Sequence, residues 1–436
     1  MEFITYLQSA LIEMLPTLIK EYGGEVAASD LSEMEAQVKA MSQSVGNAVL
    51  SEWMEAHDAT YPADTQPCPH CQAEAKYVRR RSGTVISLLG RVRYRRSYYG
   101  CHSCGQGHYP VDEQLGVRPG EMSAAVMECA ALVGIMESFE TSSDLLKRLT
   151  QLELSPNSIR KASQAMGGAV EAHEARLVAE SQSAEAQLAH RRASTKPARL
   201  YGSMDGFYAH LDGAWHEVKG GAWWMVTSDR QGQPRATDIR YYVDTLSAAA
   251  FSDLVWATGF EHHADQALEL VFIADGAAWI WNLVEEHFPH AIHIVDWYHA
   301  SAYLAPIAHA AFSDETDAQH WLDQQTDALW HGQLQAVFHA CRQCLPHAPD
   351  PVRAALTFLA RNRRRLRYDR FRQRGFQIGS GTMESGCKQL GAARLKIAGA
   401  QWHTDGARLV AKARAAYLSN QWDQLTLRPP PLPLIA

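Results

Sequence analysis

The chain has 436 residues and a mass of 48.5 kDa, with 46% hydrophobic and 20% charged residues. This composition is typical of a globular protein with room for several domains, and it excludes a disordered chain, collagen and a small disulfide scaffold. No run of 18 uncharged apolar residues occurs, so we predict no membrane-spanning helix and no membrane partner. The first 20 residues lack a basic leader region and indicate an amphipathic helix rather than a signal peptide. We therefore expect a cytoplasmic protein whose eight cysteines are thiols or metal ligands.

The formal net charge of −7 conceals two basic segments. Residues 66–110 hold eight basic residues against Glu74, and residues 361–374 hold eight arginines against Asp369, so each segment has a local charge of +7. Concentrated positive charge on an otherwise acidic chain is typical of a surface that follows a phosphate backbone. A solvated basic face is the alternative for either segment taken alone.

Residues 1–60 are predicted to be helical, and residues 66–110 are predicted to form a β-hairpin with a C-x2-C pair near each end. Four thiolates at this spacing are the usual ligands of a structural Zn²⁺ ion, which predicts a zinc ribbon. Four unrelated buried cysteines are the alternative. The predicted zinc ligands are Cys68, Cys71, Cys101 and Cys104. The arginines of the hairpin that we expect to contact DNA are Arg79, Arg80, Arg81, Arg93, Arg95 and Arg96.

Residues 111–177 show helical periodicity, and within them residues 142–167 resemble a helix-turn-helix. Ser155 is a favourable N-cap and Pro156 suits the first helical position. The start of the second helix would then face DNA with Asn157, Arg160 and Lys161. An ordinary helical hairpin is the alternative. The third C-x2-C pair, at 341–344, lies in a helical pattern without a second pair and is predicted to pack in the core, as are Cys129 and Cys387.

The periodicity changes after residues 178–198, which we interpret as a linker. Residues 199–298 contain three strand-like runs, a helix, a strand, a helix and a further strand, which predicts a mixed α/β sheet. Residues 299–374 are helical in pattern, residues 375–424 are predicted to close the domain with helices, and residues 425–436 form a proline-rich tail.

Three carboxylates in this half of the chain stand where a ligand would bind. Asp205 interrupts the first strand, where a charge is costly unless it faces a cleft or a metal ion. Asp275 ends the buried strand before a helix, and such strand ends carry the ligand sites of α/β sheets. Glu384 begins a helix after a glycine-rich turn. Together they could bind two Mg²⁺ ions, which prefer oxygen ligands and can activate the attacking and leaving oxygens of a phosphodiester.

A second element, Asp296-Trp-Tyr-His299, follows the last predicted strand. Asp296 could also line the metal site, and His299 could bind a phosphate or transfer a proton. A strand-end cap with a packed histidine explains the same spacing. Turns and arginine-rich helices account for the other candidate acids, Asp212, Asp244 and Asp369.

The succession of these motifs resembles the DDE transposases of bacterial insertion sequences, and most closely the ISKra group of the Mutator-like set. The motifs are MDG at 204–206, IADGA at 273–277, FPHAIHIVDWYH at 288–299 and GSGTMES at 379–385. The C-terminal Lys396, Trp402, Gly406-Ala407 and Arg414 and the cysteine-paired head at 77–101 are similar to the same group. The resemblance covers residues 66–420, and the order and spacing of the motifs carry it.

The resemblance implies an RNase H-like core with an all-α insertion, in which Asp205, Asp275 and Glu384 bind two Mg²⁺ or Mn²⁺ ions. It further implies that His299 contacts the DNA end near the cleavage site. The expected activity is cleavage and strand transfer of double-stranded DNA by a homodimer or larger oligomer. Phosphates near this site would be held by Arg363, Arg364, Arg365 and Arg367. The alternatives are another RNase H-like nuclease, such as a resolvase, and a domesticated DNA-binding protein without activity.

Overall fold

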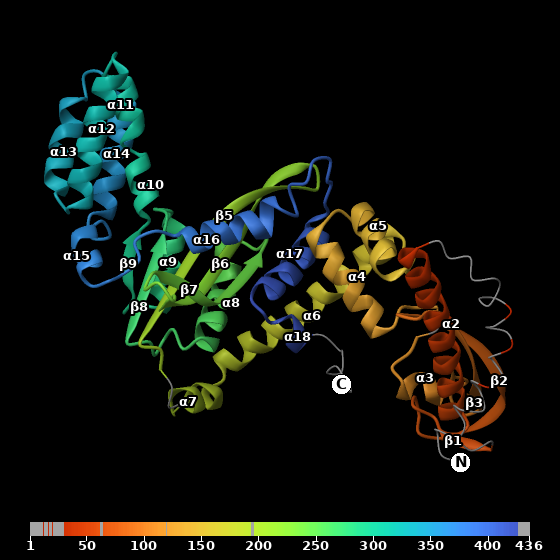
Figure 1. Cartoon of the computed structure of the whole chain (residues 1–436). Coiled ribbons are helices and arrows are strands. Elements are labelled where there is room, and N and C mark those ends of the chain that lie inside the picture. The colour runs from red at the N-terminus through yellow and green to blue at the C-terminus, as the bar shows by residue number, and fades with distance from the viewer. Residues whose placement is uncertain are drawn as a thin grey trace. The chain divides into compact units, whose positions relative to one another are not determined.

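The computed structural model describes residues 30–61, 64–118, 120–192 and 196–425, together with Ile12, Pro16 and Lys20. The chain forms two compact units, each with its own β-sheet (Figure 1). The first contains Met1–Gly134 and Phe139–Ala162, and the second contains Ile135–Ser138 and Ser163–Thr426. The mixture of sheets and helices agrees with the predicted α/β class. Within the ranges given above, no helix combines the length and the apolar character needed to cross a bilayer. The predicted tail at 425–436, except for its first residue, and most of the predicted N-terminal helix lie outside the described residues.

The sheet of the first unit is a small antiparallel sheet in the order β1-β2-β3-β4. Its strands are β1 (Thr65–Pro67), β2 (Glu74–Ser87), β3 (Gly90–Cys101) and β4 (Gly107–His108). The long β2–β3 hairpin turns at Gly90, whose φ of +94° is readily adopted only by glycine. Alternate residues of the hairpin point into a core formed by Met54, Val85, Val92, Tyr94 and Val111.

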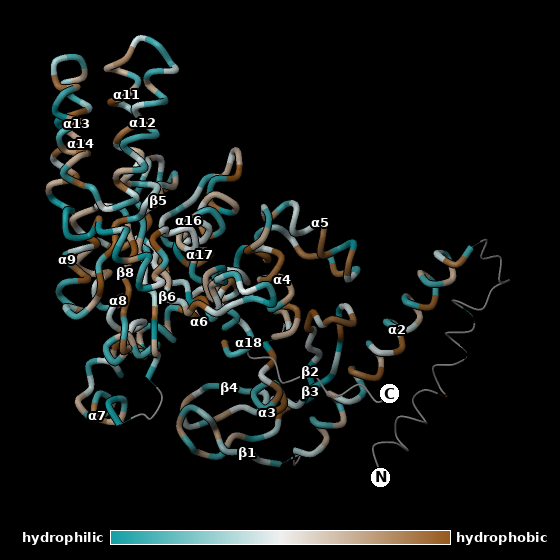
Figure 2. Tube along the Cα trace, turned by 60° about the vertical axis from the view of Figure 1, so that its left-hand side comes forward, coloured by the Kyte–Doolittle hydropathy of each residue, from teal (hydrophilic) through white to brown (hydrophobic). Residues whose placement is uncertain are grey.

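Side chains of the helix α2 (Leu31–Asp58) form hydrogen bonds with backbone groups along the edge of β3. Asp30 caps its first turn by accepting a hydrogen bond from the Glu33 amide. Three residues spaced about one turn apart then reach successive backbone groups of β3. The pairs are Ser51 with the Arg93 carbonyl, Glu55 with the Arg95 amide and Asp58 with the Ser97 amide. Figure 2 shows hydrophobic segments recurring along α2, as expected of an amphipathic helix.

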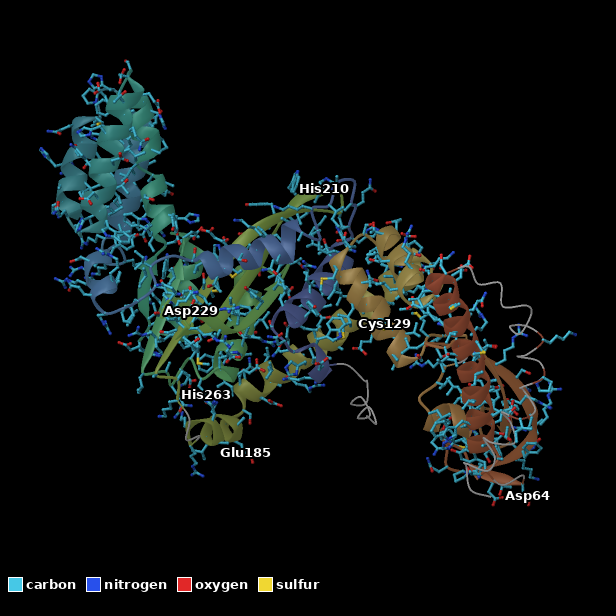
Figure 3. All side chains as sticks on the ribbon, viewed as in Figure 1. Asp64, Cys129, Glu185, His210, Asp229 and His263 are labelled. Carbon is cyan, nitrogen blue, oxygen red and sulfur yellow. The ribbon has the colours of Figure 1, made fainter. Side chains whose placement is uncertain are left out.

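The first unit continues with α3 (Pro110–Gln114), α4 (Ala124–Met136) and α5 (Phe139–Thr150), and it ends within α6 (Pro156–Gln182). The turn between α5 and α6 is the predicted one, because the Ser155 hydroxyl accepts the Ser158 amide at 3.1 Å. The linker predicted at 178–198 is largely helical instead. Its residues complete α6 and form α7 (Ala184–Arg192), where Glu185 is labelled in Figure 3. The segment is helical because alanine, glutamate, glutamine and arginine favour the helical conformation.

The sheet of the second unit has the strand order β7-β6-β5-β8-β9. Its strands are β5 (Arg199–Leu211), β6 (Ala214–Ser228), β7 (Pro234–Asp244), β8 (Glu269–Ala274) and β9 (Ile292–Val295). The strands β5, β6 and β7 pair antiparallel, whereas β8 pairs parallel to β5 and β9 parallel to β8. All five strands agree with the predicted runs. His210 lies near the far end of the β5–β6 hairpin (Figure 3).

Helices cover both faces of this sheet. The helices α8 (Ala248–Glu261) and α9 (Ala278–His287) lie on one face, where Trp223 contacts Phe272 and Phe288 edge to face and donates its ring N–H to Thr258. On the other face lie α16 (Gly381–Cys387), the π-helix η1 (Lys388–Ala392) and α17 (Thr404–Leu418), followed by α18 (Trp422–Leu425) (Figure 1). These helices lie in the segment predicted at 375–424, where residues 393–403 separate η1 from α17.

The segment between β9 and α16 is all-helical, as predicted. It contains α10 (Trp297–Ala302), α11 (Ala305–Ala311), α12 (Glu315–Trp330), α13 (Leu334–Gln343), α14 (Pro349–Asn362) and α15 (Tyr368–Gln373). The helices α11–α14 pack against one another as a bundle (Figure 1). Cys341 and Cys344 are buried within it, in agreement with their predicted packing role.

Candidate active site

Three aspartates fall level with one another across the parallel part of the second sheet. Arg199 pairs with Glu269 and Gly202 with Phe272, so the same register carried forward places Asp205 beside Asp275. Ala274 pairs with Val295, which places Asp296 beside Asp275 on the other side. Adjacent strands lie about 4.8 Å apart, and residues in one register share a face. The fold therefore presents one carboxylate from each of three neighbouring strands at the same edge.

Glu384 reaches this edge from α16, which lies close to the sheet because two glycines leave room for it. A Cβ atom at Gly220 would lie 2.9 Å from the Met383 methyl group, and one at Gly386 would lie 2.4 Å from the Tyr241 ring. The ligand atoms of Asp296, His299 and Glu384 all lie within 4.8 Å of one another. The helix thus brings Glu384 next to Asp296 and His299, although 108 residues separate it from Asp275. Asp205 and Asp275 lie outside this 4.8 Å group.

The charges of these groups act on one another. Burial raises the pKa of the Asp205 carboxyl; the hydrogen bond from the Gly206 amide opposes this rise, and the nearby Asp275 adds to it. The hydrogen bond to Asp296 raises the pKa of His299, and the charges of Asp275 and Asp205 raise it further. Asp205, Asp275 and His299 therefore act on one another electrostatically, and the His299 side chain is about half exposed.

Asp296 is buried and fully engaged in hydrogen bonds. Its Oδ1 accepts the His299 amide at 2.8 Å, and its Oδ2 accepts the amide and hydroxyl of Ser380 at 2.5 and 2.9 Å. Burial alone raises the pKa of this carboxyl, but the hydrogen bonds from His299 and Ser380 outweigh burial and hold the pKa below its usual value.

The donor set fits a hard divalent cation. Asp205, Asp275 and Glu384 are half-buried, so each residue keeps part of its surface exposed. Mg²⁺ and Mn²⁺ prefer such oxygen ligands, and a cation would relieve the repulsion between Asp205 and Asp275.

Two residues at this site escaped the sequence interpretation. Cys387 was predicted to be a core residue, but its thiol hydrogen-bonds Asp205, and burial raises its pKa above the usual range. Its spacing of three residues from Glu384 on one helix was the available signal. Ser380 stands within the glycine-rich motif before α16, and its contact with Asp296 joins residues 84 positions apart, which no local pattern reveals.

The four predicted zinc ligands come together at one end of the hairpin in the first unit. Their sulfur atoms lie within 4.8 Å of one another, with Cys68 and Cys104 3.7 Å apart and Cys71 and Cys101 3.6 Å apart. Tetrahedral Zn–S bonds of about 2.3 Å require sulfur atoms separated by about 3.8 Å. The group therefore fits a Zn²⁺ ion.

The arginines of the hairpin divide into exposed and engaged groups. Arg79, Arg93 and Arg95 are exposed, whereas Arg80 pairs with Glu55 and Asp58 and Arg81 lies over the Tyr98 ring. Arg96 was predicted to contact DNA, but only 5% of its surface is exposed. It pairs with Asp112 at 2.6 Å and lies over the Tyr109 ring, so it supports the hairpin instead.

The other predicted DNA contacts divide in the same way. Asn157 and Lys161 are exposed at the start of α6, and Arg160 is half-buried with its guanidinium on the Asn157 side chain. Among the arginines between α14 and α15, Arg365 differs from its neighbours because it pairs with Glu285 at 2.7 Å and lies over Trp281. Burial lowers its pKa. Exposed arginines in this segment include Arg363, Arg364 and Arg367.

Some of these arginines, but not Arg367, border a basic pocket of about 780 Å³ beside β9. Its lining includes Arg361, Arg363, Arg364, Arg365 and His293. Burial and the charge of Arg365 lower the pKa of His293. The pocket therefore gathers several positive charges within the same unit as the carboxylates.

Comparison with known proteins places the chain in a family but assigns it no activity. No curated protein matches the sequence. The uncharacterised protein family UPF0236 matches residues 27–424, and the chain therefore belongs to this family.

Proposed function

We propose that this protein is a DNA transposase that cleaves the ends of a mobile element and joins them to target DNA. The observation that carries the proposal is the alignment of Asp205 and Asp275 on neighbouring parallel strands, with Glu384 of α16 beside Asp296 at the end of the next strand. The strand order, with three antiparallel strands followed by two parallel ones, agrees with an RNase H-like core. The helical insertion between Asp275 and Glu384 agrees with the expected transposase architecture.

The chain would act by positioning and electrostatics. Asp205, Asp275 and Glu384 would hold two divalent cations, which when bound stabilise both the attacking and the leaving oxygen of a phosphodiester. The half-exposed His299, whose imidazolium is favoured by Asp296, would hold a phosphate oxygen or donate a proton to the leaving 3′-oxygen. Arg363, Arg364 and Arg367 would bind the DNA backbone near the site through exposed guanidinium groups.

DNA-end recognition would belong to the first unit. The four cysteines Cys68, Cys71, Cys101 and Cys104 would bind a structural Zn²⁺ ion, as reduced thiols in the cytoplasm allow. The hairpin held by this ion would present Arg79, Arg93 and Arg95 to phosphates. The helix α6 would place Asn157 and Lys161 in the major groove. Because two element ends must be joined to one target, we propose that the active form is a dimer or larger oligomer.

The decisive experiment uses the purified full-length protein, linear DNA that carries the inverted repeats flanking its gene, a target plasmid and Mg²⁺. We expect end cleavage and joined products, and we expect Asp205→Asn to abolish both while DNA binding persists. Asp350→Asn is the matched control, because Asp350 is a highly exposed acid in the helical bundle. Nicked DNA without joined products would favour a resolvase-type nuclease. Equal activity of wild type and Asp205→Asn would refute the proposal.

A further inference from the structure

The buried carboxylate of Asp296 holds the helix that carries Glu384. Asp296 has no exposed surface, and its Oδ2 accepts two hydrogen bonds from Ser380, one from the amide and one from the hydroxyl. Ser380 is itself buried and is the residue that precedes α16. A third bond joins the same two segments, because the Trp297 amide donates to the Ile378 carbonyl at 2.9 Å. The end of β9 is thereby fixed to the beginning of α16.

The connection continues from Ser380 to Glu384. The Ser380 carbonyl accepts the amide of Met383 at 2.8 Å and that of Glu384 at 3.0 Å. The position of Ser380 therefore sets the first turn of α16, and with it the direction of the Glu384 side chain. Since α16 and the π-helix η1 that directly follows it span only 12 residues together, this segment has little stability of its own and depends on such contacts.

The proximity of Asp296, His299 and Glu384 also admits a different role, in which Asp296 is itself a metal ligand. Its hydrogen bonds argue against that role. Oδ1 is occupied by the His299 amide and lies 3.4 Å from His299 Nδ1, and Oδ2 is occupied twice by Ser380. A cation would have to displace hydrogen bonds to a charged acceptor inside the protein, and such bonds are the stronger ones.

We infer that Asp296 is a positioning residue that acts through Ser380, and that this clamp sets the orientation of Glu384 for cation binding. Its expected effect on DNA cleavage rests on the proposed function, but its effect on α16 does not. Asp296→Asn replaces one acceptor oxygen by an NH₂ group, so the amide cannot serve both His299 and the two Ser380 donors. Ser380→Ala removes the hydroxyl bond and leaves the backbone bond.

The test measures hydrogen–deuterium exchange of residues 381–388 in the full-length protein, together with Mn²⁺ affinity and DNA cleavage. We expect exchange in α16 to accelerate about tenfold or more in Asp296→Asn, which removes the charged acceptor from all of these hydrogen bonds at once. The acceleration should be smaller in Ser380→Ala, which removes only the hydroxyl bond. Ser380→Thr retains the hydroxyl and should restore wild-type exchange. Ser385→Ala is the matched control, since Ser385 is exposed on the same helix and its hydroxyl accepts a hydrogen bond from Gln389 rather than from the clamp.

For the metal site, we expect Ser380→Ala to weaken Mn²⁺ binding and lower the cleavage rate at saturating DNA, and Ser380→Thr to restore both. Loss of Mn²⁺ binding in Asp296→Asn with unchanged α16 exchange would make Asp296 a ligand and overturn the clamp. Unchanged exchange in both Asp296→Asn and Ser380→Ala would also overturn it. If the two variants show accelerated exchange in α16 but the wild-type protein cleaves no DNA, the clamp is supported and only the transposase proposal is refuted.

Discussion

Replacing Gly386 by alanine tests how closely α16 must approach the sheet. The new Cβ atom would lie 2.4 Å from Cε1 of Tyr241, about 1 Å inside ordinary contact distance, and this ring is buried between α16 and β7. Either the ring or the helix must move. Overpacking of this kind costs about 1–3 kcal/mol of unfolding free energy, and a displacement of about 1 Å at a catalytic group can lower a rate about 100-fold.

Gly381→Ala provides the matched control on the same helix, because a Cβ atom added there would meet no atom of a neighbouring element within 4 Å. This substitution should be neutral or stabilise the helix by up to about 1 kcal/mol, since alanine favours helix over glycine. Urea denaturation followed by tryptophan fluorescence gives the stabilities, and DNA-end cleavage gives the rates. If Gly386→Ala matched Gly381→Ala in both measurements, the close approach of α16 would not position Glu384.

Three further predictions follow from particular contacts. Cys101→Ser should release zinc and weaken DNA binding, whereas Cys341→Ala, the control, should retain about one zinc ion per chain by elemental analysis. Equal zinc content in the two variants would contradict a zinc site formed by Cys68, Cys71, Cys101 and Cys104. Arg363→Ala or Arg364→Ala should weaken DNA binding and reduce the slope of log affinity against log salt concentration by roughly 1. Arg365→Ala should instead lower the stability of the protein, because it removes the ion-pair partner of Glu285. Equal salt slopes in all three variants would contradict the assignment of different roles to these arginines. Lys412→Met leaves Glu174 and Asp244 buried without their cation and should cost about 3–5 kcal/mol at pH 7.5. Burial already raises the pKa of Glu174, and loss of Lys412 raises it further, so the folded variant binds more protons than the unfolded chain and its stability should rise toward pH 5.5. A loss independent of pH in urea titrations would contradict that reasoning.

Much of the second unit was predictable because its signals are local. The strands at 199–211 and 269–274 are short runs of β-forming residues bounded by turns, and Asp205 and Asp275 stand out because they interrupt or end them. The two C-x2-C pairs are likewise a local signal, because their spacing alone predicts a metal site. Their four sulfur atoms lie together as that spacing indicated.

What the sequence did not reveal depends on contacts between distant residues. Arg96 stands next to the exposed Arg95, but the alternation of the strand places it on the buried face with Val92 and Tyr94. There it contacts Asp112 and Tyr109, which follow the hairpin in the chain. Ser380 gains its role from Asp296 on another element, and Cys387 from Asp205 on β5. The helix at 184–192 was interpreted as a linker because it lacks an apolar stripe. In the fold it is held by polar contacts, such as His190 with Asp265 at 2.9 Å.

The most direct test of the central claim, that Asp205, Asp275 and Glu384 jointly hold divalent cations, is Mn²⁺ binding followed by electron paramagnetic resonance with a DNA end present. We predict two bound Mn²⁺ ions per chain with the magnetic coupling expected of ions about 3.5–4 Å apart. Asp205→Asn, Asp275→Asn and Glu384→Gln should each abolish the coupled signal, and Asp350→Asn should retain it. Wild-type signals in all three site variants would contradict the account.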